Sequence, residues 1–238
     1  MADFDRKELE RRLAKVLSKD LQAELKKLLD MLGDPPDLSR VPYSYWQTGW
    51  KLIAKHVEPY LVDYFIQQAI EALDGIGVSM DLAVVNTNAV EWATNNSEKW
   101  LKEAFGHTYE GVSVLVPKAY EEGWTTAELA KALERYYSPV RAEMIAITEL
   151  TRAQVEGEKA AEQWYFETFG SHLVPIWKTA NDDKVCLICN PQPPDLPRNE
   201  MPITDDFYPP AHPRCRCRLS YLPENRLNPV QRARWQSR

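Results

Sequence analysis

Five residues near the end of the chain have the types and spacing of metal ligands. Cys186 and Cys189 form a C-x-x-C pair, His212 and Cys215 repeat that spacing, and Cys217 follows two residues later. All four cysteines of the 238-residue chain belong to this group. A tight turn brings two ligands at this spacing to one side, and two such turns supply the four ligands that zinc takes in tetrahedral geometry. The spacing therefore predicts a structural zinc site built from two knuckles.

Zinc takes four ligands, whereas the sequence offers five. The preferred set is Cys186, Cys189, His212 and Cys215, which uses both knuckles. An all-cysteine set that leaves His212 outside is the close alternative, because Cys215 and Cys217 would point the same way in an extended strand. A cluster without metal, or one with disulfides, is a further alternative. Because no secretory signal is recognisable, a reducing compartment is expected, and that disfavours disulfides.

Short strands and a long loop must position these ligands. The sequences at 172–180 and 215–222 have the alternation and the β-branched or aromatic content of strands. Between them, residues 181–212 form an irregular loop with seven prolines. A loop of about thirty residues inside a compact domain needs a reason. Metal binding provides one, because a structural zinc contributes about 10 kcal/mol or more of apparent binding free energy.

The first two thirds of the chain is predicted to be helical. Leucines recur mostly at steps of three and four over 5–32, which indicates an amphipathic helix. Thr125 and Glu128 form a capping-box signature before another helix. Ser138 followed by Pro139 predicts the start of a long helix, because serine caps and proline suits the first helical position.

The fold class that follows is mainly α. A helical N-terminal region precedes a small C-terminal α+β module with a short β-hairpin and a pair of zinc knuckles. We expect four segments. They are an amphipathic helical arm and linker at 1–40, a helical domain at 41–137, the metal-binding module at 138–222 and a basic tail at 223–238.

The charge of the chain is unevenly distributed. The net charge is −6, yet the segment 212–238 holds seven arginines and one glutamate, a net of +6, so the remainder carries −12. This asymmetry favours an acidic partner for the tail, such as nucleic acid or an acidic protein surface. A solvated tail is the equally simple alternative. The candidate contact residues are Arg226, Arg232, Arg234 and Arg238.

Several function classes lack support in the sequence. The phosphate-binding, dinucleotide-binding, nucleophile-elbow and zinc-protease motifs do not occur. No apolar run reaches the roughly 18 residues of a membrane span, so no membrane partner is expected.

Three segments together resemble the phage Mu protein F-like family of minor head proteins. They read RAEMIAITELTRA at 141–153, WKTANDDKVCLIC at 177–189 and PPAHPRCRCRL at 209–219. Besides the five candidate ligands, the residues that match the family pattern, in structural roles, are Thr148, Glu149, Arg152, Trp177, Thr179 and Asp182.

The resemblance implies a function that the residues alone do not. A protein of this family would be a non-catalytic minor head protein of a tailed phage, found in the virion and associated with the portal. It would act in head morphogenesis, with the portal, the major capsid or scaffold protein and double-stranded DNA as the expected partners. The amphipathic helix at 5–32 could then dock in a groove of a partner. A zinc-stapled nucleic-acid-binding protein or nuclease is the alternative.

Overall fold

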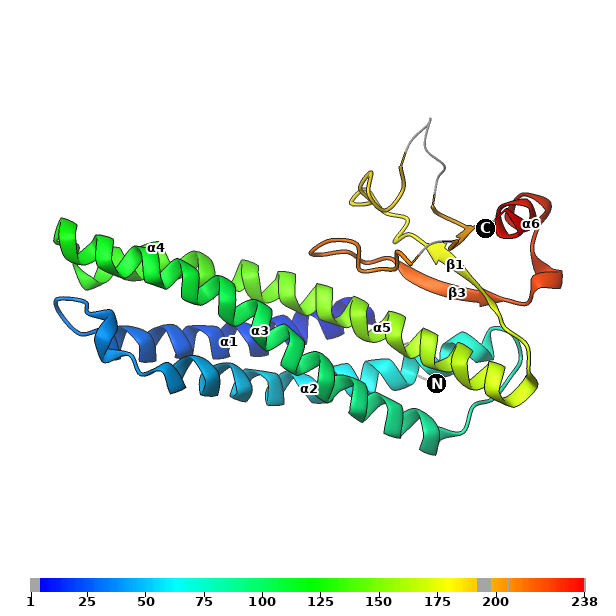
Figure 1. Ribbon diagram of the computed structural model, residues 1–238, viewed down its shortest axis with the longest axis horizontal. Coiled ribbons are helices and arrows are strands. Elements are labelled where there is room, and N and C mark those ends of the chain that lie inside the picture. The colour runs from blue at the N-terminus through cyan, green and yellow to red at the C-terminus, as the bar shows by residue number, and fades with distance from the viewer. Residues whose placement is uncertain (1–4, 192–197, 205, 238) are drawn as a thin grey trace. The chain divides into compact units, whose positions relative to one another are not determined.

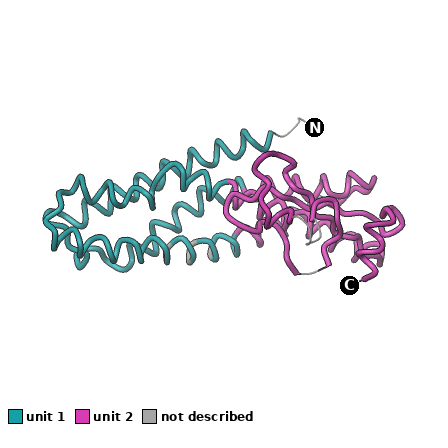
Figure 2. Tube along the Cα trace, turned by 90° about the horizontal axis from the view of Figure 1, so that it is seen from above, with its two compact units in different colours: residues 1–60, 94–146 teal, residues 61–93, 147–238 magenta. Residues whose placement is uncertain are grey.

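The computed structural model describes residues 5–191, 198–204 and 206–237. The described chain divides into two compact units (Figure 2). Unit 1 comprises 1–60 and 94–146, and unit 2 comprises 61–93 and 147–238. Each unit is thus assembled from segments that are distant in sequence, and the divisions fall inside long helices.

Unit 1 is a bundle of helices. It contains α1 (Arg6–Leu32), the first part of α2 (Tyr43–Asp74), the second part of α3 (Leu82–Glu122), α4 (Thr126–Tyr137) and the beginning of α5 (Pro139–Phe169). The Asp5 carboxylate caps α1 by accepting from Lys7 N, and Gly33 follows the last turn with a positive φ of 71°. The helix predicted over 5–32 is therefore confirmed.

The apolar stripe of α1 is used inside unit 1. Its leucines are buried, and α1 packs against α4. The expectation that this helix offers its apolar face to a partner is wrong, because that face already forms the core of the unit. The buried leucines are Leu9, Leu13, Leu17, Leu21, Leu28 and Leu32.

Both predicted helix starts are confirmed. Thr125 and Glu128 form a reciprocal capping box at α4. The Ser138 hydroxyl accepts from Arg141 N at 3.2 Å, and Pro139 is the first residue of α5. A capping box satisfies two backbone donors that have no partner within the helix, which is why these short motifs could be located without the fold.

Unit 2 joins helices to a small antiparallel sheet (Figure 1). The sheet has the order β2–β1–β3, formed by β1 (Val174–Lys178), β2 (Met201–Pro202) and β3 (Arg218–Leu222). The two strands predicted from the sequence pair with each other, with Ile176 opposite Ser220. The strand β2 was not predicted, because two residues that include a proline carry no recognisable pattern.

The core of unit 2 places the cysteines among apolar side chains. Residues of α2, α3 and α5 pack with those of β1 and β3, and Cys189, Cys215 and Cys217 belong to the same cluster. A Cβ at Gly157 of α5 would lie 2.4 Å from the Phe65 carbonyl oxygen of α2. The two helix backbones therefore meet at a position that only glycine fits.

The segment after β3 is folded rather than extended. It forms η2 (Glu224–Arg226) and α6 (Pro229–Gln236), with an Asn228 capping box. The buried Gln231 side chain donates to the Glu200 carbonyl at 2.7 Å, and Trp235 packs against the apolar cluster of β1. The helices in the described part of the chain are either too short or too polar to cross a bilayer.

Candidate metal centre

The first knuckle is a pair of tight turns that ends at Cys189. The Asp182 side chain accepts from Lys184 N at 3.0 Å, and Asn190 N donates to the Cys186 carbonyl at 2.9 Å. Burial raises the pKa of the Cys186 thiol, but backbone N–H groups of Cys189 and Ile188 donate to its sulfur and bring the pKa below its usual value. Backbone donors around a sulfur stabilise the thiolate, which is the form that binds metal.

The second knuckle is closed by a turn between His212 and Cys215. Cys215 N donates to the His212 carbonyl at 3.1 Å. Arg214 between them has a φ of 62°, a left-handed conformation that is uncommon for a residue with a Cβ. The turn thus brings the imidazole and the thiol to one side, as the H-x-x-C spacing predicts.

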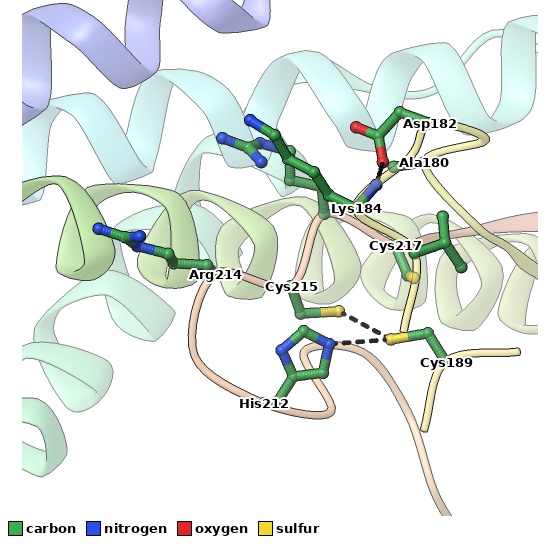
Figure 3. Close-up of a pocket in the computed structure, with 10 residues that line it drawn as sticks. Ala180, Asp182, Lys184, Cys189, His212, Arg214, Cys215 and Cys217 are labelled. Atoms are coloured by element: carbon green, nitrogen blue, oxygen red, sulfur yellow. Dashed lines mark hydrogen bonds between the residues drawn. The ribbon is translucent and has the colours of Figure 1, made fainter. Parts of the chain in front are cut away.

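The five candidate ligands form two groups that share Cys189. The ligand atoms of Cys186, Cys189 and His212 lie within 4.8 Å of one another, and so do those of Cys189, Cys215 and Cys217. Figure 3 shows Cys189 with His212, Cys215 and Cys217. The His212 Nε2 atom lies 3.2 Å from the Cys186 sulfur and 3.1 Å from the Cys189 sulfur. The sulfurs of Cys189 and Cys215 are 3.7 Å apart.

These separations match the edges of a zinc coordination tetrahedron. Zinc–sulfur bonds of about 2.3 Å and zinc–nitrogen bonds of about 2.0 Å place two sulfurs about 3.8 Å apart and a sulfur about 3.5 Å from a nitrogen. The sulfur–sulfur distance agrees closely, and the two sulfur–nitrogen distances are a few tenths of an ångström shorter. The thiolate and imidazole donors of each group are therefore spaced as ligands of one small ion, although each group supplies three ligands and Cys189 is the residue that they share.

The imidazole of His212 has the tautomer that a ligand requires. Its Nδ1 atom lies 2.7 Å from the Pro213 carbonyl oxygen. A carbonyl can only accept, so Nδ1 carries the proton and Nε2 presents its lone pair to the cysteines. A backbone carbonyl that fixes the tautomer of a metal-binding histidine is a common supporting contact. This contact favours His212 as a direct ligand.

Hydrogen bonds among the buried cysteines shift the pKa values of their thiols in opposite directions. Hydrogen bonds from Cys189 and Cys217 lower the pKa of Cys215 to about 2, and the backbone N–H groups of Ala211 and Cys217 act in the same direction against burial. The same contacts raise the pKa of Cys189, which keeps its proton when it donates. The cluster thus concentrates negative charge on buried sulfur, which a bound cation would stabilise.

Three of the five candidate ligands are buried, and Cys186 and His212 are half-buried. Cys189, Cys215 and Cys217 are each no more than 2% exposed. Lys184 and Arg214 also line the hollow around the sulfurs, but their charged ends point away from them (Figure 3). Buried ligands of this kind are typical of structural zinc rather than of a catalytic ion with an open position.

Three of the residues that match the family pattern lie on α5 in unit 2. Thr148 contacts the second knuckle, since its hydroxyl accepts from Arg214 N at 3.0 Å. Glu149 is buried and lies 3.4 Å from the Arg152 guanidinium, so these two residues form an ion pair within the helix.

The other three lie around the first knuckle. Trp177 is buried in β1 and stacks on Phe207. Thr179 N donates to the Asn199 side chain at 3.0 Å, and Asp182 holds the turn before Cys186. Each contact supports the local backbone.

Other polar residues of α5 were missed by sequence reasoning. The buried Thr151 hydroxyl donates to the Cys215 carbonyl at 2.5 Å, and the buried Glu158 carboxylate accepts from Leu219 N at 2.8 Å. Glu162 accepts from Leu173 N at 3.2 Å. With Thr148 they lie on one face of the helix, and that shared face is the signal that could have found them.

The candidate contacts of the basic segment lie at the end of unit 2. Arg226 and Arg232 are exposed, whereas Arg234 is half-buried. Arg238 lies outside the described residues. The nuclease alternative would need a histidine outside the cluster, beside a second metal, to activate water, and His172 is the candidate. It pairs with Glu162 at 2.9 Å and stacks on Phe166.

The fold and the site define a helical protein whose small C-terminal sheet is held by a cysteine and histidine cluster. Residues 110–220 match the family described as Phage Mu protein F like protein. The match supports the family predicted from the motifs, and it covers both knuckles. This family suggests a phage head morphogenesis protein. Comparison with curated proteins and with solved structures found no match.

Proposed function

We propose that this chain is a minor head protein of a tailed phage, which acts in head morphogenesis at the portal vertex without catalysing a reaction. The observation that carries the proposal is the family match over 110–220, which includes every candidate ligand and the α5 motif. The burial of Cys189 and Cys215 supports a structural role, while Cys186 and His212 are half-buried. Its location would be the virion.

The metal in this proposal is a structural zinc held by Cys186, Cys189, His212 and Cys215. Zinc would join two segments of a region that has little regular structure between β1 and β3. Its chemistry here is the formation of four bonds, which stabilises the fold of unit 2. Cys217 would lie beside the ion as a buried neighbour.

The portal role can be tested by co-purification. The full chain is co-expressed with the portal protein of the same phage genome, and the complex is isolated through a tag on the portal. We expect the chain to elute with the portal ring. In the control, the tagged major capsid protein is expressed in place of the portal, and it should capture less of the chain. Elution of the chain alone in the portal experiment would contradict the assignment to the portal vertex.

Contact with packaged DNA belongs to the same proposal. The arginines of η2 and α6, of which Arg226 and Arg232 are exposed and Arg234 is half-buried, would bind phosphates without reading sequence, and such binding weakens steeply with salt. Replacing Arg226, Arg232 and Arg234 with glutamine should lower the slope of log K against log salt by about 2–3. The matched control replaces three exposed lysines of α1 with glutamine, namely Lys15, Lys19 and Lys26. Equal slopes for all proteins would exclude DNA contact through α6.

A further inference from the structure

One face of α5 holds the backbone of the ligand-bearing segment. Thr148, Thr151 and Glu158 contact backbone atoms of Arg214, Cys215 and Leu219 respectively. Spacings of three and seven residues place these side chains on one side of a helix. The segment that runs from the second knuckle into β3 is therefore fixed to a rigid element at three points.

The two threonines act on the knuckle itself. The Thr148 hydroxyl accepts from Arg214 N at 3.0 Å, and the Thr151 hydroxyl donates to the Cys215 carbonyl at 2.5 Å. Together they bind the backbone N–H of Arg214 and the carbonyl oxygen of Cys215. Thr151 is fully buried, so solvent does not compete for this contact.

These two hydrogen bonds act at a residue whose backbone conformation is unfavourable by itself. Arg214 has a φ of 62°, a left-handed conformation that is unfavourable for a residue with a Cβ. Such a conformation persists only when its surroundings fix it. If the two contacts were lost, the turn could relax and move the Cys215 sulfur away from Cys189, which now lies 3.7 Å from it.

We propose that Thr148 and Thr151 are positioning residues of the metal centre, which set its affinity by holding Cys215 in the coordination geometry. The inference rests on the proposed zinc site, and it adds a helix that contributes no ligand. Loss of a contact that orients a metal ligand typically costs 10–100-fold in metal affinity. The same range is expected here for each threonine.

The test compares zinc affinity among variants of the full chain in reducing buffer, by competition with a chromophoric chelator. Thr151→Val keeps the shape of the side chain and removes the hydroxyl, and we expect zinc to bind about 10–100-fold more weakly. Thr148→Val should act in the same direction. Thr151→Ser keeps the hydroxyl and should restore affinity to within about threefold of the wild type.

A matched control separates positioning from general loss of stability. Thr108 of α3 in unit 1 is also fully buried, and its hydroxyl finds no partner in the described part of the chain. Thr108→Val should leave zinc affinity unchanged. The visible spectrum of the cobalt(II)-loaded protein gives a second measurement, because it reports the geometry around the ion. It should change in Thr151→Val and not in Thr108→Val.

The outcomes distinguish the two proposals. If the wild type binds no zinc, the metal site and this inference both fail. If the wild type binds zinc and both threonine-to-valine variants bind it within about twofold of the wild type, the metal site stands and the positioning role is wrong. If Thr151→Val does not fold, Thr148→Val decides, because its contact lies at the surface of the knuckle rather than in the core.

Discussion

The assignment of four ligands among five candidates predicts different fates for three alanine variants. Cys189 belongs to both groups of the cluster, and the Cys215 sulfur lies 3.7 Å from the Cys189 sulfur. Replacing either with alanine should remove a zinc ligand. Cys217→Ala should leave four ligands in place and therefore retain one zinc per chain.

The expected magnitudes differ enough to be measured. Structural zinc contributes about 10–16 kcal/mol, so loss of one ligand in four costs on the order of 3 kcal/mol, or more than a hundredfold in affinity. Cys217 is 2% exposed in the apolar core of unit 2. Its truncation should therefore cost about 1 kcal/mol of unfolding free energy through the cavity that it leaves, with little effect on affinity.

The assay is zinc content by mass spectrometry after gel filtration with a weak chelator, followed by competition with a strong one. His212→Ala tests the histidine in the same series and should behave like Cys215→Ala. If Cys217→Ala loses its zinc while His212→Ala keeps it, the all-cysteine set is correct. The tautomer argument for His212 would then be refuted.

Three further predictions concern other parts of the chain. Gly157→Ala should lower the unfolding free energy by about 1–2 kcal/mol, because the close contact with the Phe65 carbonyl outweighs the gain in helix propensity. Gly106→Ala should raise the unfolding free energy by about 1 kcal/mol, because a Cβ there meets no described atom within 4 Å. Equal shifts of the two variants in denaturant titrations would contradict this reasoning. Thr125→Ala should cost about 1 kcal/mol at neutral pH. Hydrogen bonds from Thr125 lower the pKa of Glu128, so the difference should shrink as pH falls below the ordinary glutamate value of 4.5, and a constant difference would show that the capping box does not titrate. Incubation of plasmid with the protein and magnesium or manganese should leave the plasmid intact, and cleavage that disappears in His172→Ala would establish the nuclease alternative.

The helices could be predicted because their signals are local. The leucine period of α1 and the capping box of α4 depend on residues within a few turns, so the sequence was sufficient. Local sequence signals do not determine what the apolar face of α1 packs against. Its leucine stripe suits a partner groove as well as the core of a bundle, and only the fold shows that it is buried in unit 1.

The same distinction between local and long-range signals applies to the candidate site. Ligand types and spacings are local, so all five candidates could be identified before the fold was known. The contacts that hold them join residues 61 to 66 positions apart, as Thr148 joins Arg214 and Glu158 joins Leu219. Pairings at such separations leave no pattern in a single sequence. The strand β2 was missed for the same reason, because its pairing with β1 rather than its composition makes it a strand.

The cysteines of this chain belong both to the metal cluster and to the hydrophobic core. Cys189, Cys215 and Cys217 pack with Trp177 and Leu219, so the sulfurs fill space that larger apolar side chains would fill in an ordinary core. Between β1 and β3 the described chain has few such side chains and one two-residue strand. A bound ion would therefore do more than join two turns. It would hold the sulfurs at the separations that let the sheet pack on α5, while the threonines of α5 hold the turn that presents Cys215. On this view the metal centre and the α5 face stabilise each other, and neither is complete when the other is altered.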